Sequence, residues 1–231
     1  SVTKGINDSE PICMTQLADS ILGTQTTALS GPSHAEEVAR DVPTAVVVAN
    51  KDLSVAEEWQ QLFNSNTFRV YTSDDVLGIQ LGGALKNIIA IAVGACDGLG
   101  FGDNTKAALI TRGLAEISRL GITLGAQPET FAGLSGMGDL IVTCMSEHSR
   151  NRSVGYRLGR GESVQQIMDS MVQVAEGVWN CKPAQALAQK HAIEVPVINE
   201  VCAVLFEGKQ PLEAVTDLLN RTPRPEHDKH L

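Results

Sequence analysis

Residues 76–96 read VLGIQLGGALKNIIAIAVGAC and form the longest apolar run of the chain. A helix of this length can cross a bilayer. Three polar residues, Gln80, Lys86 and Asn87, interrupt the run, and a charge near the centre of a membrane helix is costly. We therefore expect a buried helix in the core of a soluble protein and no integral membrane segment.

Downstream of this run the sequence shows helical periodicity only. Pro196 and Pro211 stand where a first helical turn accepts proline, and Asn104 can cap another helix. These patterns predict an all-helical domain over residues 76–231. Its expected helices cover residues 76–96, 105–124, 138–145, 150–158, 164–171, 174–191, 196–206 and 211–219.

Upstream, residues 1–75 alternate between strand and helix patterns. The run TAVVVA at 44–49 is β-branched, which is typical of a strand buried on both faces. The run TFRVYT at 67–72 alternates in polarity and predicts a second strand. A short strand at 27–29 and helices at 13–22 and 55–63 complete the set. This order favours βα units on a mostly parallel sheet, so an incomplete α/β part precedes the helical domain.

The composition excludes several classes of protein. The 231 residues carry a formal net charge of −9 and 4% aromatic residues, whereas a nucleic-acid binder normally shows a basic face and stacking rings. The five cysteines form no Cys-x-x-Cys pair, which is typical of reduced thiols in a cytoplasmic protein. No metal is expected, because the histidines lack ligand spacing apart from a tail pair, His227 and His230, that is more typical of a solvated end.

Lys86 is the most informative single residue. Its neighbours on one helical face, Gly82, Gly83, Ile89 and Ala90, are mostly small. Two glycines inside a helix cost about 1 kcal/mol each relative to alanine, which predicts the close approach of another backbone or of a ligand. A lysine buried there has a lowered pKa and can exchange protons near neutrality. The alternative is a lysine whose stem packs while its ammonium reaches solvent, and this stretch alone does not decide between them.

Asp139 follows a glycine-rich turn and opens an apolar helix. A first-turn aspartate interacts favourably with the helix dipole, and this capping role is the simpler interpretation. The alternative places the carboxylate opposite Lys86, with Thr143 on the same helical face presenting a hydroxyl to the same site. The residues alone favour capping.

Signals for ligand binding occur at three further places. Residues 149–151 (Ser-Arg-Asn) open a predicted helix, where free amides and an arginine fork suit a phosphate dianion, although most such runs are solvated helix starts. Lys4 and the turn at 31–33 (Gly-Pro-Ser) follow predicted strands, where α/β sheets bind ligands. The glycine-rich run at 98–102 follows a helix and does not fit the dinucleotide fingerprint. Each of these signals is weak by itself.

As a set, the motifs resemble those of the NAD(P)-dependent glycerol-3-phosphate dehydrogenases of the bacterial biosynthetic type. The matching stretches occur in the family's order and cover nearly the whole chain. They are residues 3–5, 30–33, 82–91 with LKN at 85–87, 94–102, 111–116, 136–140, 149–151 and 174–177. The resemblance implies the end of a Rossmann domain, followed by a helical domain like that of 6-phosphogluconate dehydrogenase.

The resemblance also implies the reaction, a reversible hydride transfer between NAD(P)H and dihydroxyacetone phosphate that yields sn-glycerol 3-phosphate for phospholipid synthesis. Lys86 corresponds to the lysine that exchanges a proton at the reacting oxygen, because hydride addition builds negative charge there. Lys4, Asn87, Asp139 and Thr143 are implied to surround it. The implied phosphate site is Ser149, Arg150 and Asn151, with Gly31 and Ser33 lining the pocket. The implied cofactor contacts are Lys4, Ala35, Arg150, Val174 and Glu176.

Members of this family begin with a glycine-rich nucleotide-binding loop, and this sequence starts after it. The resemblance therefore implies a C-terminal fragment that is inactive alone. The exposed sheet edge and the uncovered interdomain face of such a fragment would favour aggregation or a homodimer. Neither the role of His34 nor a preference for NADH or NADPH is indicated. Two other functions stay open, a related dehydrogenase acting on a hydroxy acid and a helical dimerisation module without catalysis.

Overall fold

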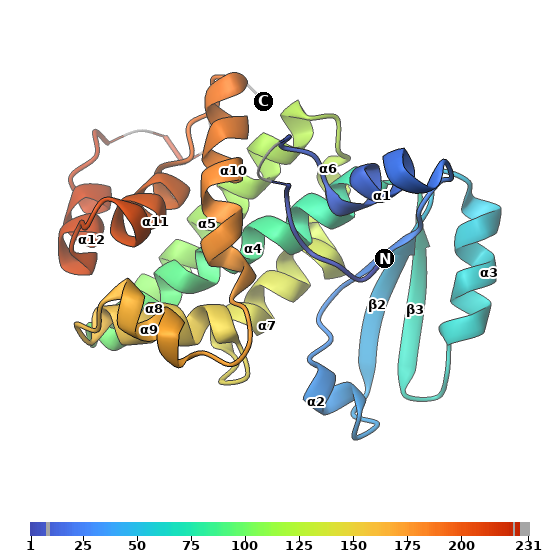
Figure 1. Cartoon of the computed structure of the whole chain (residues 1–231), viewed down its shortest axis with the longest axis horizontal. Coiled ribbons are helices and arrows are strands. Elements are labelled where there is room, and N and C mark those ends of the chain that lie inside the picture. The colour runs from blue at the N-terminus through green and yellow to red at the C-terminus, as the bar shows by residue number, and fades with distance from the viewer. Residues whose placement is uncertain (8–9, 224, 227–231) are drawn as a thin grey trace.

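The computed structural model describes residues 1–7, 10–223 and 225–226. A small sheet with its helices stands beside a larger helical part, and the long helix α4 (Val76–Gly98) runs from the sheet into the middle of that part (Figure 1). This is the fold class that the sequence predicts, an α/β part followed by an all-helical part. The predicted tail pair, His227 and His230, lies outside the described residues.

The sheet has three strands in the order β1 (Ala28–Ser30), β2 (Thr44–Ala49) and β3 (Phe68–Ser73). β2 and β3 pair in parallel, as predicted, but β1 pairs antiparallel with β2, so the expectation of a mostly parallel sheet is wrong for that pair. A parallel pairing needs a crossover of a dozen or more residues, usually through a full helix. The connection from β1 to β2, residues 31–43, is long enough for a crossover. Its helix α2 (Ala35–Val38), however, has only four residues and cannot span the sheet as a crossover helix does, which accounts for the reversal.

The helices occur where the apolar periodicity places them, with ends within two residues of the prediction. They are α1 (Met14–Leu22), α3 (Leu53–Phe63), α4, α5 (Asp103–Thr123), α7 (Asp139–Met145), α8 (Arg150–Gly159), α9 (Val164–Ser170), α10 (Glu176–Lys190), α11 (Pro196–Phe206) and α12 (Pro211–Leu219). The prediction misses three short elements, α2, α6 (Pro128–Ala132) and a π-helical turn, η1 (Leu134–Gly138). It also misplaces the start of α5, because Gly102 and not Asn104 is the extended residue that precedes the helix.

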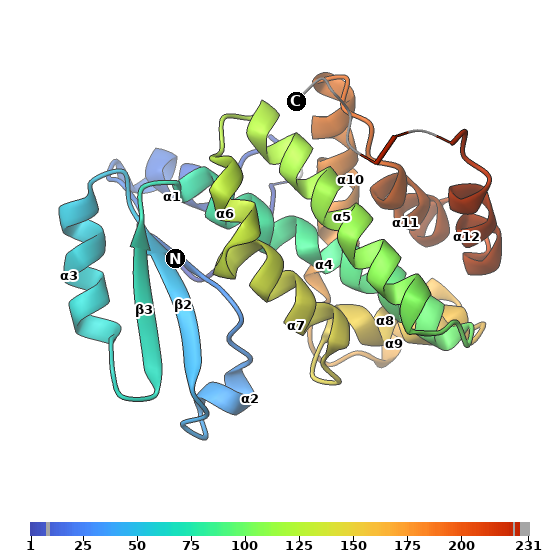
Figure 2. The ribbon, with the colours of Figure 1, turned by 180° about the vertical axis from the view of Figure 1, so that it is seen from behind.

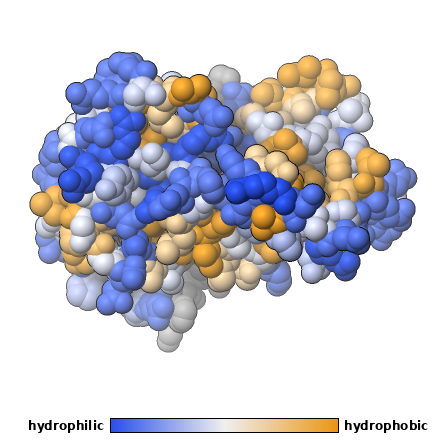
Figure 3. Space-filling model, turned by 90° about the horizontal axis from the view of Figure 1, so that it is seen from below, coloured by the Kyte–Doolittle hydropathy of each residue, from blue (hydrophilic) through white to orange (hydrophobic). Residues whose placement is uncertain are grey.

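α4 is the core of the helical part. By length and composition it could cross a membrane, yet α5, α7, α8, α10 and α11 surround it and most of it is buried (Figures 1 and 2). A helix that is apolar on all sides belongs in such a core. On the face seen in Figure 3, hydrophobic residues form separate patches among hydrophilic ones and no continuous apolar belt. The prediction of a buried core helix is confirmed.

Asp75 fixes the direction in which α4 leaves the sheet. Its Oδ1 accepts a hydrogen bond from the Gly78 amide at 2.9 Å and caps the helix. Its Oδ2 accepts from the Gln127 amide at 2.9 Å and from the Thr130 hydroxyl at 2.6 Å. One buried carboxylate thus ties the start of α4 to the segment around α6, because charged acceptors make the stronger hydrogen bonds.

α4 and α8 approach each other through glycines. A Cβ added at Gly94 or Gly98 would clash with the carbonyls of Arg152 and Tyr156 on α8. Conversely, a Cβ at Gly155 on α8 would clash with the Ile91 carbonyl on α4. The two backbones therefore touch, and this contact sets where the first residues of α8 lie relative to Lys86.

We expect Gly155→Ala to lower the free energy of unfolding by about 3 kcal/mol, because a carbonyl of the main chain cannot move aside as a side chain can. Urea denaturation of the full-length protein, followed by circular dichroism, measures the change. Gly102→Ala is the matched control, since a Cβ there meets nothing within 4 Å. A loss for Gly155→Ala below about 0.5 kcal/mol, the range of ordinary surface substitutions, would contradict the close packing of α4 on α8.

Candidate active site

Lys86 lies at the centre of a buried ionic cluster. Its Nζ donates to Asp139 Oδ1 at 2.7 Å and to the hydroxyl of Thr143. The other carboxylate oxygen, Asp139 Oδ2, accepts from Lys4 Nζ at 2.7 Å. The side chains of Lys86 and Asp139 are only 7% and 2% exposed. Lys86 therefore does not extend its ammonium into solvent. The capping role that the residues alone favour for Asp139 is wrong, because each of its carboxylate oxygens binds a lysine.

The glycines beside Lys86 make room for this cluster. A Cβ at Gly82 would lie 2.7 Å from the carbonyl oxygen of Ser135 in η1, so the backbone before Asp139 touches α4 directly. A Cβ at Gly83 would lie 3.3 Å from Cγ of Lys4. The predicted close approach of another backbone is confirmed, and it brings Asp139 and Lys4 to the same lysine.

Asn180 on α10 holds the segment that carries Lys4. Its Oδ1 accepts from the Ile6 amide and its Nδ2 donates to the Ala84 carbonyl on α4, each at 3.1 Å. The sequence analysis misses this residue. The sequence does contain one indication of its role, which is an amide side chain among the apolar residues of a predicted helix. A buried amide needs hydrogen-bond partners, so its presence there indicates a contact with another segment.

The surroundings of Lys86 change its acidity. Burial lowers its pKa to about 8, and the positive charge of Lys4 acts in the same direction, while Asp139 opposes both. An ammonium in a low-dielectric site gives up its proton more readily than one in water. A pKa of about 8 allows Lys86 to exchange protons near neutral pH, which is one of the two alternatives that the sequence leaves open.

A second group of polar side chains adjoins the first. Asn87, next to Lys86 on α4, donates from Nδ2 to Glu176 Oε2 at 3.0 Å. Asn151 Oδ1 accepts from the Gly177 amide at 2.8 Å. Gly177 lies so close to the Asn87 carbonyl that a side chain there would clash. The start of α8, the start of α10 and the middle of α4 therefore meet beside the lysine.

Arg150 stands at the outer edge of this region. It is exposed, and its Nη1 donates to the carbonyl of Val174 at 2.8 Å. Ser149 precedes it as the N-cap of α8, accepting from the Arg152 amide at 3.2 Å. The predicted helix start is confirmed, with an arginine fork and free amides on the same turn, which is chemistry that suits an anion.

His34 lies close to the ionic cluster. Burial lowers the pKa of its imidazole, and the charge of Lys86 lowers it further. Its ring is 6.0 Å from that of His148, which brings the turn before α2 next to the loop before α8. The sequence analysis leaves His34 without a role and overlooks His148.

The structure links some predicted residues to the cluster and leaves others apart. Ser33 donates its hydroxyl to the Gly31 carbonyl at 3.1 Å, within its own turn. Ala35 and Val174 are exposed at the surface. Within the described residues, no group of three acidic, histidine or cysteine side chains could hold a metal ion.

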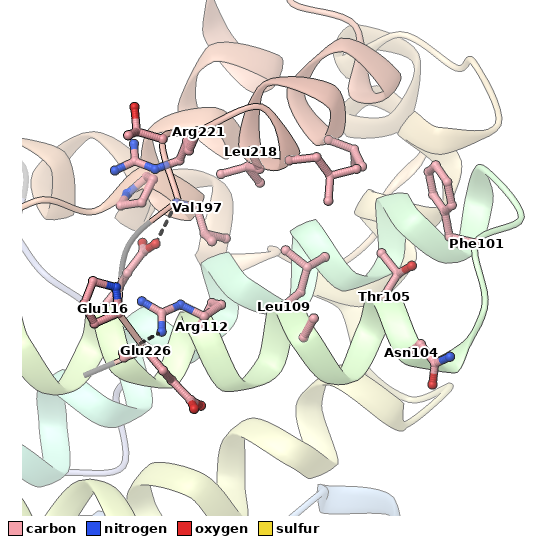
Figure 4. Close-up of a pocket in the computed structure, with 16 residues that line it drawn as sticks. Phe101, Asn104, Thr105, Leu109, Arg112, Glu116, Val197, Leu218, Arg221 and Glu226 are labelled. Atoms are coloured by element: carbon pink, nitrogen blue, oxygen red, sulfur yellow. Dashed lines mark hydrogen bonds between the residues drawn. The ribbon is translucent and has the colours of Figure 1, made fainter. Parts of the chain in front are cut away.

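A cavity in the helical part shares no residue with this site. It measures about 580 Å³ and lies between α5, α11 and α12 (Figure 4). Glu116 borders it, and its carboxylate accepts from the amides of Val197 at 2.8 Å and Ile198 at 3.2 Å, capping α11. Burial raises the pKa of Glu116 to about 7. These two hydrogen bonds give Glu116 a structural role at the start of α11. Among the described residues, the cavity that it borders therefore shows no group placed for chemistry comparable to the Lys86 cluster.

Comparison with known proteins covers both parts of the chain. Residues 1–56 match the family described as NAD-dependent glycerol-3-phosphate dehydrogenase N-terminus, and residues 75–216 match the corresponding C-terminus. The glycerol-3-phosphate dehydrogenase (NAD(P)+) of Pelotomaculum thermopropionicum is 54% identical over 225 residues, which cover 96% of this chain and 64% of that protein. The one from Chlorobium luteolum is 50% identical, over 99% of this chain and 70% of its own length.

A solved structure shows the same family resemblance. The glycerol-3-phosphate dehydrogenase of Coxiella burnetii has a TM-score of 0.91 at 42% identity, and the match covers 95% of this chain and 68% of that one. This chain spans 64% to 70% of the length of these three relatives. The resemblance inferred from the motifs is confirmed, and the chain belongs to the NAD-dependent glycerol-3-phosphate dehydrogenase family.

Proposed function

We propose that the protein reversibly transfers hydride between NAD(P)H and dihydroxyacetone phosphate in the cytoplasm, and so supplies sn-glycerol 3-phosphate for phospholipid synthesis. The observation that carries the proposal is the buried ammonium of Lys86, held by Asp139 and Thr143, with a pKa of about 8. The motifs that surround it in this family are present in order along the chain, and the phosphate-binding chemistry of α8 lies beside it.

Lys86 acts as the acid in ketone reduction. An ammonium has three N–H donors, of which Asp139 and Thr143 take two, so one is left for the carbonyl oxygen of the substrate. Thr143 donates its own proton to the Asp139 carbonyl at 2.6 Å, so it accepts from the lysine and fixes its direction. As negative charge grows on the substrate oxygen, Lys86 transfers its proton, and Lys4 keeps Asp139 in place.

The start of α8 binds the substrate phosphate. Ser149, Arg150 and the amide group of Asn151 surround the free N–H groups of the first turn, and a guanidinium pairs with a phosphate through two parallel hydrogen bonds. Gly31 and Ser33, in the turn after β1, would line the same pocket, as the family resemblance implies. This anchor holds the carbonyl carbon at a fixed position, which accounts for a large part of the rate in such reactions.

Lys4, Ala35, Arg150, Val174 and Glu176 would hold the dinucleotide, which supplies the hydride when bound. Arg150 fits that role because its guanidinium is exposed and keeps donors beyond its bond to Val174. In this proposal residues 1–75 are the end of the cofactor-binding Rossmann domain and residues 76–231 are the substrate-binding and catalytic domain, and each part contributes contacts to both ligands. The exposed apolar residues Trp59, Leu62 and Phe63 on α3 support a homodimer, which sedimentation velocity would measure.

An assay of NAD(P)H oxidation by the full-length protein tests the function. We expect turnover with dihydroxyacetone phosphate and at least about 100-fold lower kcat/KM with 2-oxo acids, because a site that binds a phosphate leaves buried polar groups unpaired without it. Higher kcat/KM with an oxo acid would favour the hydroxy-acid dehydrogenase instead. A folded protein that binds neither nucleotide nor substrate would favour the dimerisation module.

The two directions of the reaction should respond oppositely to pH. Reduction needs Lys86 charged, so its kcat/KM is highest below pH 8 and falls as the pH rises through the pKa of about 8. Oxidation of glycerol 3-phosphate needs the neutral amine, so its rate rises over the same range. Initial rates from pH 6.5 to 9.5 in both directions measure this. Parallel changes in the two directions would contradict a proton exchange at Lys86.

A further inference from the structure

We propose that Glu176 is a positioning residue that turns the oxygen of the Asn87 amide toward the substrate, so that the site selects phosphorylated ketones with a hydroxyl group next to the carbonyl. The inference rests on the proposed function and deepens it. It assigns to Glu176 a task that is distinct from the cofactor contact implied by the family resemblance.

The hydrogen bonds of Asn87 leave one orientation of its amide. Its Nδ2 donates to Glu176 Oε2 at 3.0 Å and to the Gly83 carbonyl at 3.4 Å. An ionised carboxylate and a carbonyl can only accept, so only the NH₂ end of the amide can face them. The amide oxygen must therefore point the other way.

That oxygen is available to a ligand. Within the described part of the chain, Asn87 Oδ1 has no hydrogen-bond donor. Asn87 is only 3% exposed, yet its oxygen is not among the unpartnered polar atoms that are sealed from solvent, such as Ser30 Oγ and His34 Nε2. A small molecule beside Lys86, the preceding residue on α4, can reach it.

The backbone around Glu176 is held firmly. Glu176 is the first residue of α10, where the helix dipole favours a carboxylate. The next residue, Gly177, donates its amide to Asn151 Oδ1 and packs against the Asn87 carbonyl without room for a side chain. The favourable interaction of Glu176 with the dipole of α10 does not require a hydrogen bond to Asn87. The pairing of Glu176 with Asn87 is therefore a feature of the site that helix capping does not explain.

An unpaired amide oxygen in a buried site recognises a hydroxyl group. Dihydroxyacetone phosphate carries a hydroxymethyl group on its carbonyl carbon, and that hydroxyl can donate to Asn87 Oδ1. An analogue with a methyl group there leaves the oxygen without a partner, which a site built for a hydroxyl penalises strongly. The chemical class selected is thus the phosphorylated α-hydroxy ketones.

The test compares kcat/KM for dihydroxyacetone phosphate with that for acetol phosphate, its analogue with a methyl in place of the hydroxymethyl group. In Glu176→Gln the new amide can donate to the Asn87 oxygen and let that amide turn around. We expect the preference for the hydroxylated substrate to fall at least about 10-fold in Glu176→Gln, and equally in Asn87→Ala. Glu213→Gln, which removes a first-turn carboxylate from α12, is the matched control and should leave the preference unchanged.

A second measurement separates this role from a merely structural one. The negative charge of Glu176 raises the pKa of Lys86, so Glu176→Gln should move the midpoint of the reduction profile to lower pH. An unchanged preference in Glu176→Gln, or a change confined to KM for NAD(P)H, would overturn the inference while the proposed function stands. A wild-type protein inactive on dihydroxyacetone phosphate would overturn both.

Discussion

Replacing Lys86 with alanine should lower kcat for ketone reduction by about 10²- to 10⁴-fold, the usual contribution of a positioned acid. The variant should fold, because Asp139 keeps its ion pair with Lys4 and is not left as an unpaired buried charge. Steady-state rates in the full-length enzyme measure the loss, and fluorescence titration with NADH measures cofactor binding, which should be unchanged.

Lys86→Arg is the control that separates charge from proton transfer. A guanidinium keeps the positive charge but does not release its proton in this pH range, so the variant should remain nearly as slow as Lys86→Ala. Turnover close to wild type in Lys86→Ala would remove Lys86 from the mechanism. Recovery in Lys86→Arg would show that charge alone suffices.

Replacing Arg150 with alanine should raise KM for dihydroxyacetone phosphate by about 10- to 100-fold, because a charge-assisted hydrogen bond contributes roughly 1.5–3 kcal/mol. The change should affect kcat less, since the hydrogen bond of Arg150 goes to Val174 and not to the groups that hold Lys86. The non-phosphorylated ketone dihydroxyacetone is the comparison substrate, and its kcat/KM should change little.

Arg160→Ala, at the other end of α8, is a suitable control because it removes an exposed arginine without touching the predicted phosphate site. It should leave both KM values near those of wild type. Equal losses with dihydroxyacetone and its phosphate in Arg150→Ala would mean that Arg150 serves the cofactor or the fold, and not the substrate phosphate.

The charges of the site suit an anionic substrate. Two ammonium groups, Lys4 and Lys86, share the carboxylate of Asp139, and Glu176 is the further carboxylate whose charge acts on Lys86. In the proposed reaction the two ammonium groups would stabilise the oxyanion that forms when hydride reaches the carbonyl carbon. Burial and Lys4 together outweigh Asp139 and Glu176 in lowering the pKa of Lys86.

Local patterns predict most of the elements and the central residue. The β-branched run of β2 and the apolar run of α4 are visible because each follows a local periodicity. Lys86 stands out because a charge among glycines and isoleucines must have a partner if it is buried. The glycine pair beside it predicts the close approach of a backbone or a ligand, and the structure places the backbone of Ser135 against Gly82 and side chains against Gly83.

What the residues alone do not reveal depends on contacts between distant segments. Asp139 has the local pattern of a cap, and only the fold shows that Lys4 and Lys86 reach its two oxygens from elsewhere in the chain. Asn180 is missed for the same reason, since its partners lie 174 and 96 residues away. The reversed pairing of β1 follows from a connection without a long helix, which a strand pattern does not encode.

Rescue of Lys86→Ala by added amines tests proton donation by Lys86 most directly. Removing the lysine side chain opens a space beside Asp139 in which a small alkylammonium ion fits. Our account predicts that methylammonium and ethylammonium restore reduction in proportion to their concentration, whereas tetramethylammonium, which has no proton to give, does not. Equal stimulation by tetramethylammonium, or fast turnover without any amine, would contradict it.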